Sequence, residues 1–366
     1  MQNPFRLNWQ ETAGALGDYG TLLPIIIGVA AVTEVDLSYI LFFFATSYII
    51  TGLYYKLPIP VEPMKAIGVV AIGGTLSSAE IAAAGIFMGL LLLLLVFTGG
   101  INFIKNIVPE CIIRGIQLGL ALILLREAFN FIAADWQLGL ISVSLVLIFT
   151  LAPILDVSAL VVFALGLGWG IYYYGPPPLT FLSWPDLVIP AAGDLWVGFW
   201  HGAIPQLPLT LGNAVLATTL LVKDLFHKKV PEKQLMLSMS LMCLISSTLG
   251  GFPMCHGAGG LAAQYRFGAR TGGSNIISGI ILLLVAVFFA SPQLVNILPF
   301  GALGALLLFS GLELIKSATK TEHLLITVIT AAIALFGGMP LALGVMLVYY
   351  WIARYFRLNP WKKVNQ

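Results

Sequence analysis

The chain has 366 residues, of which 59% are hydrophobic and only 9% are charged, and its mean hydropathy is +0.98. A soluble globular domain is about a quarter charged, so this composition excludes an ordinary soluble enzyme. Stretches such as 37–55, 81–104 and 271–312 contain no Asp, Glu, Lys or Arg. Each is long enough to cross a bilayer, which takes about 20 apolar residues. We therefore predict an all-α polytopic membrane protein.

The net charge and the cysteine content exclude some functions but do not indicate one. The formal net charge of +2 gives no reason to expect a nucleic-acid partner, because basic residues in such a chain are placed by topology. Cys111, Cys243 and Cys255 are scattered and odd in number, and they predict neither a disulfide framework nor a metal site. No cofactor is expected. The first residues lack the basic start and apolar core of a cleaved signal, so the first span is expected to direct insertion itself.

Charges, prolines and glycine pairs divide the chain into fourteen apolar segments. They are expected at about 13–33, 37–55, 64–76, 81–98, 109–126, 137–152, 157–175, 203–222, 235–249, 254–266, 273–290, 299–316, 323–338 and 339–357. An even number places both termini on one side. The positive-inside rule makes that side cytoplasmic, because basic residues then concentrate inside, at Lys223 to Lys233 and after Arg354. We expect the plasma (inner) membrane.

The same division predicts the domain organisation. The segment from Gly175 to Trp200 carries Asp186 and Asp194 but no Lys or Arg, as an external connection should. We expect a first seven-span repeat at 1–175, an external connection at 176–202, a second seven-span repeat at 203–358 and a cytoplasmic tail at 359–366.

Two segments, the third and the tenth, are too short to cross the membrane as full helices. In 57–74, three prolines force extended geometry before a helix begins near Pro63. In 250–273, a glycine pair breaks the chain before a helix begins near Pro253. Short, interrupted segments at corresponding places in two halves indicate a transporter's binding site.

Repeated landmarks relate the two halves. Pro63-Met64 and Pro253-Met254 are 190 residues apart, and so are Pro109 and Pro299. The pattern Pro24-x-x-x-Gly28-x-Ala30 recurs 184 residues later, beginning at Pro208. Because each unit holds an odd number of spans, the two copies are predicted to be inverted, with the two half-helices meeting at the midplane.

A helix that begins inside a bilayer presents unpaired N–H groups and the positive end of its dipole, and an anion satisfies both. Gly257 and Gly259 add backbone that a ligand can approach closely. The candidate substrate contacts on the half-helices are Pro63, Met64, Lys65, Ala66, Met254, Cys255, His256, Gly257 and Gly259.

Each chemically distinctive residue in these segments has a structural alternative. Lys65 is a candidate charge partner for an anion, because a cation inside a membrane is costly and usually functional. Its alternative role is to pair with Glu62. His256 can contact substrate or carry a proton, or it can cap a carbonyl. Cys255 and His256 are adjacent without a second ligand pair, so a metal site is disfavoured.

The opening spans of both halves supply further polar candidates. In the first half these are Asp18, Tyr19 and Thr21, whose alternative role is a glycine-rich helix entry. In the second half, Gln206, Thr210 and Asn213 share one helix face, and their alternative role is hydrogen bonding between helices. Arg114 can line an anion path, and Glu110, one turn away, is an equally good partner for it.

At GDYGTLLP, PVEPMKAI, GNAVLA and FPMCHGAGGLAAQYRFGARTGG, the sequence resembles the molybdate transporter family, a branch of the sulfate permease superfamily. The resemblance spans residues 11–355. It implies fourteen segments in two inverted repeats, divided into core and gate domains, a fold shared with nucleobase permeases. It also implies substrate contacts on 61–67 and 253–260. Nucleobase permeases carry carboxylates on the eighth and tenth spans, which this chain lacks before Asp224.

The leading hypothesis is a secondary active transporter that imports a tetrahedral oxyanion, molybdate ahead of sulfate or tungstate. Cation symport is expected, with protons favoured over sodium and with Asp18, Glu62 and His256 as candidate carriers. The alternatives are a sulfate transporter and an uncoupled anion channel. An enzyme is not expected, because no HExxH or serine-elbow motif occurs. Membrane lipid is an expected partner, and a homodimer is left open.

Overall fold

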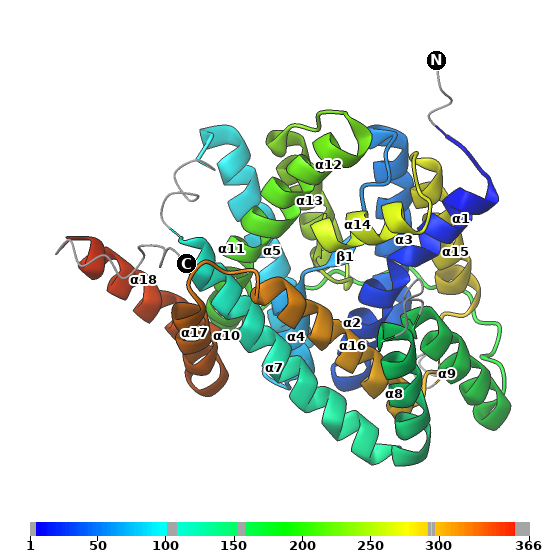
Figure 1. Ribbon diagram of the computed structural model, residues 1–366. Coiled ribbons are helices and arrows are strands. Elements are labelled where there is room, and N and C mark those ends of the chain that lie inside the picture. Colours follow the sequence, from blue (N-terminus) through cyan, green and yellow to red (C-terminus); the bar gives the residue numbers. More distant parts are fainter. Residues whose placement is uncertain (1–4, 101–107, 152–157, 292–293, 295–296, 356–366) are drawn as a thin grey trace.

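The computed structural model describes residues 5–100, 108–151, 158–291, 294 and 297–355. Across these residues the regular structure is helical apart from two very short strands, and irregular segments such as 175–191 connect the helices (Figure 1). The first-half elements are α1 (Trp9–Gly17), α2 (Tyr19–Val32), α3 (Leu37–Tyr55), β1 (Glu62–Pro63), α4 (Lys65–Ile72), α5 (Ser78–Thr98), α7 (Glu110–Ala134), α8 (Trp136–Leu151) and α9 (Ser158–Tyr174). The second-half elements are α10 (Ala192–Val197), η1 (Gly198–Ala203), α11 (Ile204–Leu209), η2 (Thr210–Ala217), α12 (Thr218–Phe226), α13 (Glu232–Thr248), β2 (Met254–Cys255), α14 (Ala258–Arg266), α15 (Gly273–Phe288), α16 (Phe300–Ala318), α17 (Leu324–Gly337) and α18 (Met339–Tyr355).

The helices are apolar enough for a membrane protein. Among the described residues, five helical stretches are long and apolar enough to cross a bilayer, and α1 with α2, bent by 43°, makes a sixth if the pair is one span. Five more apolar helices are shorter, at 10–17 residues. Each of the fourteen predicted segments overlaps a helix or a run of helices, while the expected tail at 359–366 lies outside the described residues.

Three helix starts differ from the prediction by four residues or more. The tenth segment becomes helical at Ala258 rather than 254, because Met254 and Cys255 pair with β1 instead. The first segment begins at Trp9 rather than 13, because Asn8 caps it by accepting a hydrogen bond from the Glu11 N–H. The eighth begins at Ala192 rather than 203, since the Asp194 carboxylate accepts from the Ala191 N–H at 2.8 Å. This eighth segment runs to Phe226 and contains two π-helical turns, η1 and η2. Such turns are rare and occur frequently at functional sites.

The two half-helices are α4 and α14, with eight and nine residues. At 1.5 Å per residue they are about 12 and 14 Å long, less than half of the bilayer's apolar thickness of about 30 Å. The strands that precede them pair antiparallel, Glu62 with Cys255 and Pro63 with Met254. The Met64 N–H also donates to the Pro253 carbonyl at 3.0 Å. The strands therefore start the two half-helices next to each other inside the bundle (Figure 1).

Helix packing follows a matched pattern. Helix α3 packs on α15 and α5 packs on α13, which are the second, eleventh, fourth and ninth segments. Likewise α7 packs on α17 and α16 packs on α8, and the long helices α7 and α16 pack on each other. If each segment is replaced by the one seven places before or after it, the α3–α15 contact becomes the α13–α5 contact. The α7–α17 contact becomes the α16–α8 contact in the same way.

Glycines permit the closest of these approaches. A Cβ on Gly279 would lie 2.6 Å from the Ala45 carbonyl oxygen, between α15 and α3. A Cβ on Gly304 would lie 2.8 Å from the Ala128 carbonyl oxygen, between α16 and α7. Small residues at helix contacts are how membrane bundles pack, since lipid gives little hydrophobic drive for association.

Candidate functional site

A cavity of about 570 Å³ lies where the two half-helices begin. Its walls come from α2, α7, η2 and α16 as well as from α4 and α14. Seven predicted site residues line it: Thr21, Lys65, Gln206, Thr210, Asn213, Cys255 and Gly259. The cavity therefore collects residues from the opening spans and the half-helices of both halves.

The other predicted residues are buried behind the cavity wall. These are Asp18, Tyr19, Pro63, Met64, Ala66, Met254, His256 and Gly257. The Tyr19 hydroxyl donates to the Ser278 carbonyl at 3.0 Å, toward α15. Burial gives these residues a supporting position, one layer away from any ligand in the cavity.

The start of α4 is capped by the second half of the chain. The Ala66 N–H donates to Oε1 of Gln206 at 2.8 Å, and Nε2 of Gln206 donates to the Thr210 hydroxyl at 2.9 Å. Met64, the N-cap residue, offers no side-chain cap of its own. The polar stripe predicted on the eighth segment thus lies against the first half-helix, with Asn213 beside it on the cavity wall.

Two carboxylates lie against the start of α14. The Glu62 side chain is fully buried, and a Cβ on Gly257 would overlap its Oε2. A Cβ on Gly260 would lie 2.6 Å from Oε1 of Glu62 and would overlap Oδ1 of Asp18. Negative groups are stabilised at a helix N-terminus by its free N–H groups and its dipole. Glu62 and Asp18 therefore lie close to the position where the sequence predicted a bound anion.

Lys65 belongs both to this carboxylate cluster and to the cavity. Its Nζ lies 3.0 Å from Oε2 of Glu62, the pairing anticipated as its structural role, while 18% of its side chain remains accessible in the cavity. The same Nζ is the nearest atom, at 3.8 Å, to a Cβ built on Gly259. Lys65 is therefore a cation in the cavity wall that lies at the start of α4 and close to the start of α14.

The cluster carries an excess of negative groups. The Thr21 hydroxyl lies 2.9 Å from Oδ1 of Asp18 and 3.3 Å from Oε1 of Glu62, and the Tyr48 hydroxyl donates to Oδ2 of Asp18. Two ionised carboxylates against one ammonium leave one negative charge, which is costly in a buried site. One proton or one monovalent cation would neutralise the cluster.

His256 has both ring nitrogens engaged away from the cavity. Its Nδ1 lies 2.7 Å from the Pro60 carbonyl, so Nδ1 carries a hydrogen, and its Nε2 lies 2.8 Å from the Ser238 hydroxyl. This is the carbonyl-capping arrangement anticipated as its structural role. Among the residues that the structure describes, no group of three His, Cys, Asp or Glu side chains could hold a metal.

The cavity also has a basic rim that the sequence reasoning identified only in part. Five cationic side chains line the cavity against one acidic one, Glu313: Lys65, Arg114, Arg266, Lys316 and Lys320. Arg114 pairs with Glu110 at 2.8 Å, as anticipated, and also donates to Gln117 at 3.2 Å and Ser317 at 2.9 Å. Lys316 pairs with Glu313 at 2.6 Å and Lys65 pairs with Glu62, so the positive charge that can raise the local concentration of anions rests mainly on Arg266 and Lys320.

Gln117 and the α16 residues Phe309, Ser310 and Ser317 also line the cavity but were not among the predicted site residues. Gln117 lies one turn after Arg114, a spacing that could have indicated it. Nothing in the sequence of α16 indicates a site, because its contribution depends on packing against α7.

Interrupted half-helices that meet at a cavity inside an apolar helical bundle are the arrangement in which many membrane transporters bind their substrates. The profile of the family described as "Molybdate transporter of MFS superfamily" matches residues 10–124 and 198–314. Molybdate transporter 2 of Arabidopsis thaliana is 34% identical, over 96% of this chain and 88% of that protein. Molybdate transporter 1 of the same plant is 32% identical, over 97% and 91%. The chain belongs to the molybdate transporter family, a family of transporters and not of enzymes.

Solved structures show the fold. The transmembrane domain of the cyanobacterial bicarbonate transporter BicA superposes with a TM-score of 0.67 at 16% identity, covering 94% of this chain and 97% of that one. SLC26A9 gives 0.67 at 14% identity, covering 95% and 65%. The chain thus has the fold of these two proteins. Its family and its apolar helices make it an integral membrane protein.

Proposed function

We propose that this chain is a secondary active transporter that imports molybdate by cation symport. The observation that carries the proposal is one cavity that presents Lys65 at the start of α4 and the bare backbone of Gly259 at the start of α14. A tetrahedral dianion fits this pairing of a cation with helix N–H groups. The curated relatives named as molybdate transporters support molybdate ahead of sulfate or tungstate.

In this proposal the chain forms fourteen segments in two inverted repeats, 1–175 and 203–358. Supporting it, the strand pairing maps onto itself at the repeat offset of 190, since Pro63 opposite Met254 becomes Pro253 opposite Met64. The exchange of packing partners between α3–α15 and α5–α13 points the same way. Both termini are placed in the cytoplasm of a plasma (inner) membrane, the 176–202 connection outside, and a homodimer stays a prediction.

The coupling step in this proposal is an exchange at Glu62. Bringing a dianion into a negative interior costs about 4.6 kcal/mol per 100 mV, so a co-transported cation is needed to accumulate it. With Glu62 ionised, its carboxylate holds Lys65 and the start of α14. A proton on the Glu62 and Asp18 pair releases Lys65 and the start of α14, and both can then contact the oxyanion. The engaged ring nitrogens of His256 favour the carboxylates over His256 as carriers.

Proteoliposomes test the function directly. Purified protein should accumulate radiolabelled molybdate when the outside is made acidic, with no sodium present. Sulfate in excess should compete more weakly than unlabelled molybdate. Accumulation that requires a sodium gradient instead would assign the cluster's neutralising cation to sodium. Flux that follows only the membrane potential, without concentrating the anion, would identify an uncoupled channel and reject symport.

A further inference from the structure

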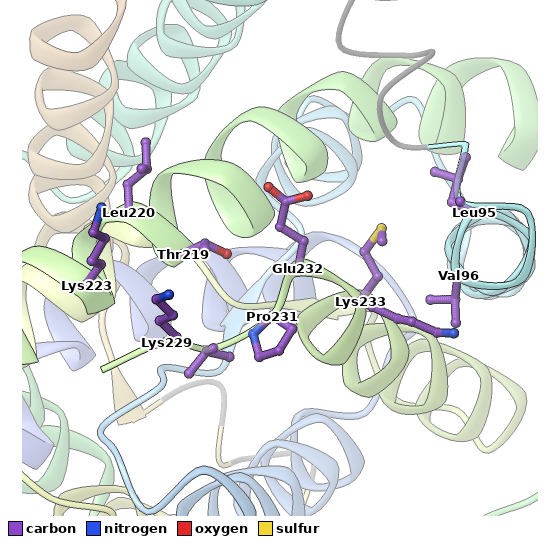
Figure 2. Close-up of a pocket in the computed structure, with 12 residues that line it drawn as sticks. Leu95, Val96, Thr219, Leu220, Lys223, Lys229, Pro231, Glu232 and Lys233 are labelled. Carbon is purple, nitrogen blue, oxygen red and sulfur yellow. The ribbon is translucent and has the colours of Figure 1, made fainter. Parts of the chain in front are cut away.

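A second pocket of about 500 Å³ lies between the end of α5, helix α12 and the start of α13 (Figure 2). Figure 2 shows Leu95 and Val96 on one side, Leu220 and Lys223 on the other, and Pro231 and Glu232 between them. The pocket shares no lining residue with the transport cavity.

The chemistry of this pocket is mixed. Three lysines line it, Lys223, Lys229 and Lys233, against one carboxylate, Glu232. The remaining wall is apolar, with Leu95, Val96, Leu220 and Met236 among its residues. The hydroxyl of Thr219, also in the wall, is buried and has no hydrogen-bond partner among the described residues. A ligand that fits is therefore anionic, accepts or donates hydrogen bonds, and carries apolar groups.

The location of the pocket places it at a membrane surface. Helix α5 has 21 residues, or about 31 Å, and qualifies as a membrane span, so its last turn, which lines the pocket, lies where the span leaves the bilayer. Next to the pocket, apolar side chains point outward on α5 and α12: Leu94 is 57% exposed, Phe97 78% and Leu220 60%. Acyl chains would cover these side chains while a headgroup enters the pocket.

We infer that this pocket binds the headgroup of an anionic phospholipid. The phosphate would lie beside Lys223 and Lys229, which Figure 2 shows on the same side of the pocket, and the acyl chains would lie along Leu94, Phe97 and Leu220. Basic pockets between membrane helices bind anionic headgroups in this way. A soluble phosphate compound shares the headgroup chemistry but makes no use of the apolar surface.

Native mass spectrometry of the detergent-purified full chain tests the site. Phosphatidylglycerol should form a retained one-lipid adduct in preference to phosphatidylcholine with the same acyl chains. Lys223→Gln and Lys229→Gln should each weaken the phosphatidylglycerol adduct about fivefold, which is the effect of one basic residue near an anionic surface. Lys228→Gln is the matched control, because Lys228 is the neighbour of Lys229 and does not line the pocket.

Two outcomes would overturn the inference. Equal loss of the adduct in Lys228→Gln and Lys229→Gln would reduce the effect to general surface charge. Displacement of the lipid by glycerol 3-phosphate at the same concentration would assign the pocket to a soluble phosphate compound. Size-exclusion profiles matching the native protein establish that each variant is folded, so a lost adduct reports on the site.

Discussion

Oε1 of Gln206 accepts a hydrogen bond from the Ala66 N–H at 2.8 Å, so a side chain from the second half of the chain caps the half-helix of the first. The two residues are 140 positions apart in the sequence. This bond ties the wall of the cavity to the start of α4, and it satisfies a donor that the apolar interior would otherwise leave unpaired.

Gln206→Ala should therefore destabilise the protein by about 1–3 kcal/mol, because the buried Ala66 N–H loses its acceptor. The unfolding temperature of the purified protein should fall. Gln264→Ala is the control, since both amide atoms of the buried Gln264 have no partner among the described residues. A drop in Gln264→Ala as large as that in Gln206→Ala would show that the cap contributes little.

Lys65→Ala should abolish molybdate uptake or reduce it strongly while the protein stays folded. The variant removes the cation that lies at the start of α4, in a low-dielectric site where it attracts a dianion far more than in water. Lys65→Arg should also be impaired, because the forked guanidinium is larger and bonds differently. Uptake into proteoliposomes measures both, and near-normal uptake by Lys65→Ala would leave Lys65 with only its structural pairing to Glu62.

Glu62→Gln should make molybdate binding independent of pH. Under the proposed coupling, one proton on the carboxylate cluster frees Lys65 for the anion, so affinity should rise as pH falls and weaken as pH rises. The glutamine variant mimics the protonated state and should bind at alkaline pH as tightly as the native protein does at acidic pH. Binding titrations across the pH range decide this, and an unchanged pH profile in Glu62→Gln would move the coupling elsewhere.

Gly257→Val and Gly259→Val should fail in different ways. A side chain at Gly257 overlaps the Glu62 carboxylate, so that variant should lose stability, whereas Gly259 has only Lys65 Nζ nearby, at 3.8 Å. Gly259→Val should therefore fold and lose molybdate binding, because its side chain covers backbone that the anion approaches. Cys255→Ala keeps the backbone donor and should bind nearly normally. Normal binding by Gly259→Val together with loss in Cys255→Ala would favour a side-chain site.

The proposed topology predicts which loops face the cytoplasm. In a variant without native cysteines, a cysteine at position 228 should be protected from an impermeant thiol reagent added outside, and one at position 179 should be labelled. Basic residues near 223–233 are the physical reason, since such loops stay inside. External labelling at 228, or protection at 179, would reject both orientation and span count.

The sequence alone determined the helical segments and the positions of the half-helices. Apolar length and charge-free runs predict α3 within a residue, and Pro63 marks where α4 can begin, because proline removes a donor and restricts the preceding backbone. The start of α14 was predicted too early, since Met254 and Cys255 pair with β1 and the helix begins at Ala258. The polar face of Gln206, Thr210 and Asn213 also followed from helical spacing, and all three line the cavity.

Only the tertiary structure decided what fills the start of each half-helix. The sequence predicted free N–H groups for an anion there, whereas the structure places Gln206 against α4 and the Glu62 and Asp18 carboxylates against α14. Likewise it showed that His256 points toward Pro60 and Ser238, and that α16 brings Ser317 to Arg114. Spacing along one helix fixes which residues share a face. Packing across the bundle decides which groups from distant helices reach a buried donor. The local sequence does not determine that packing.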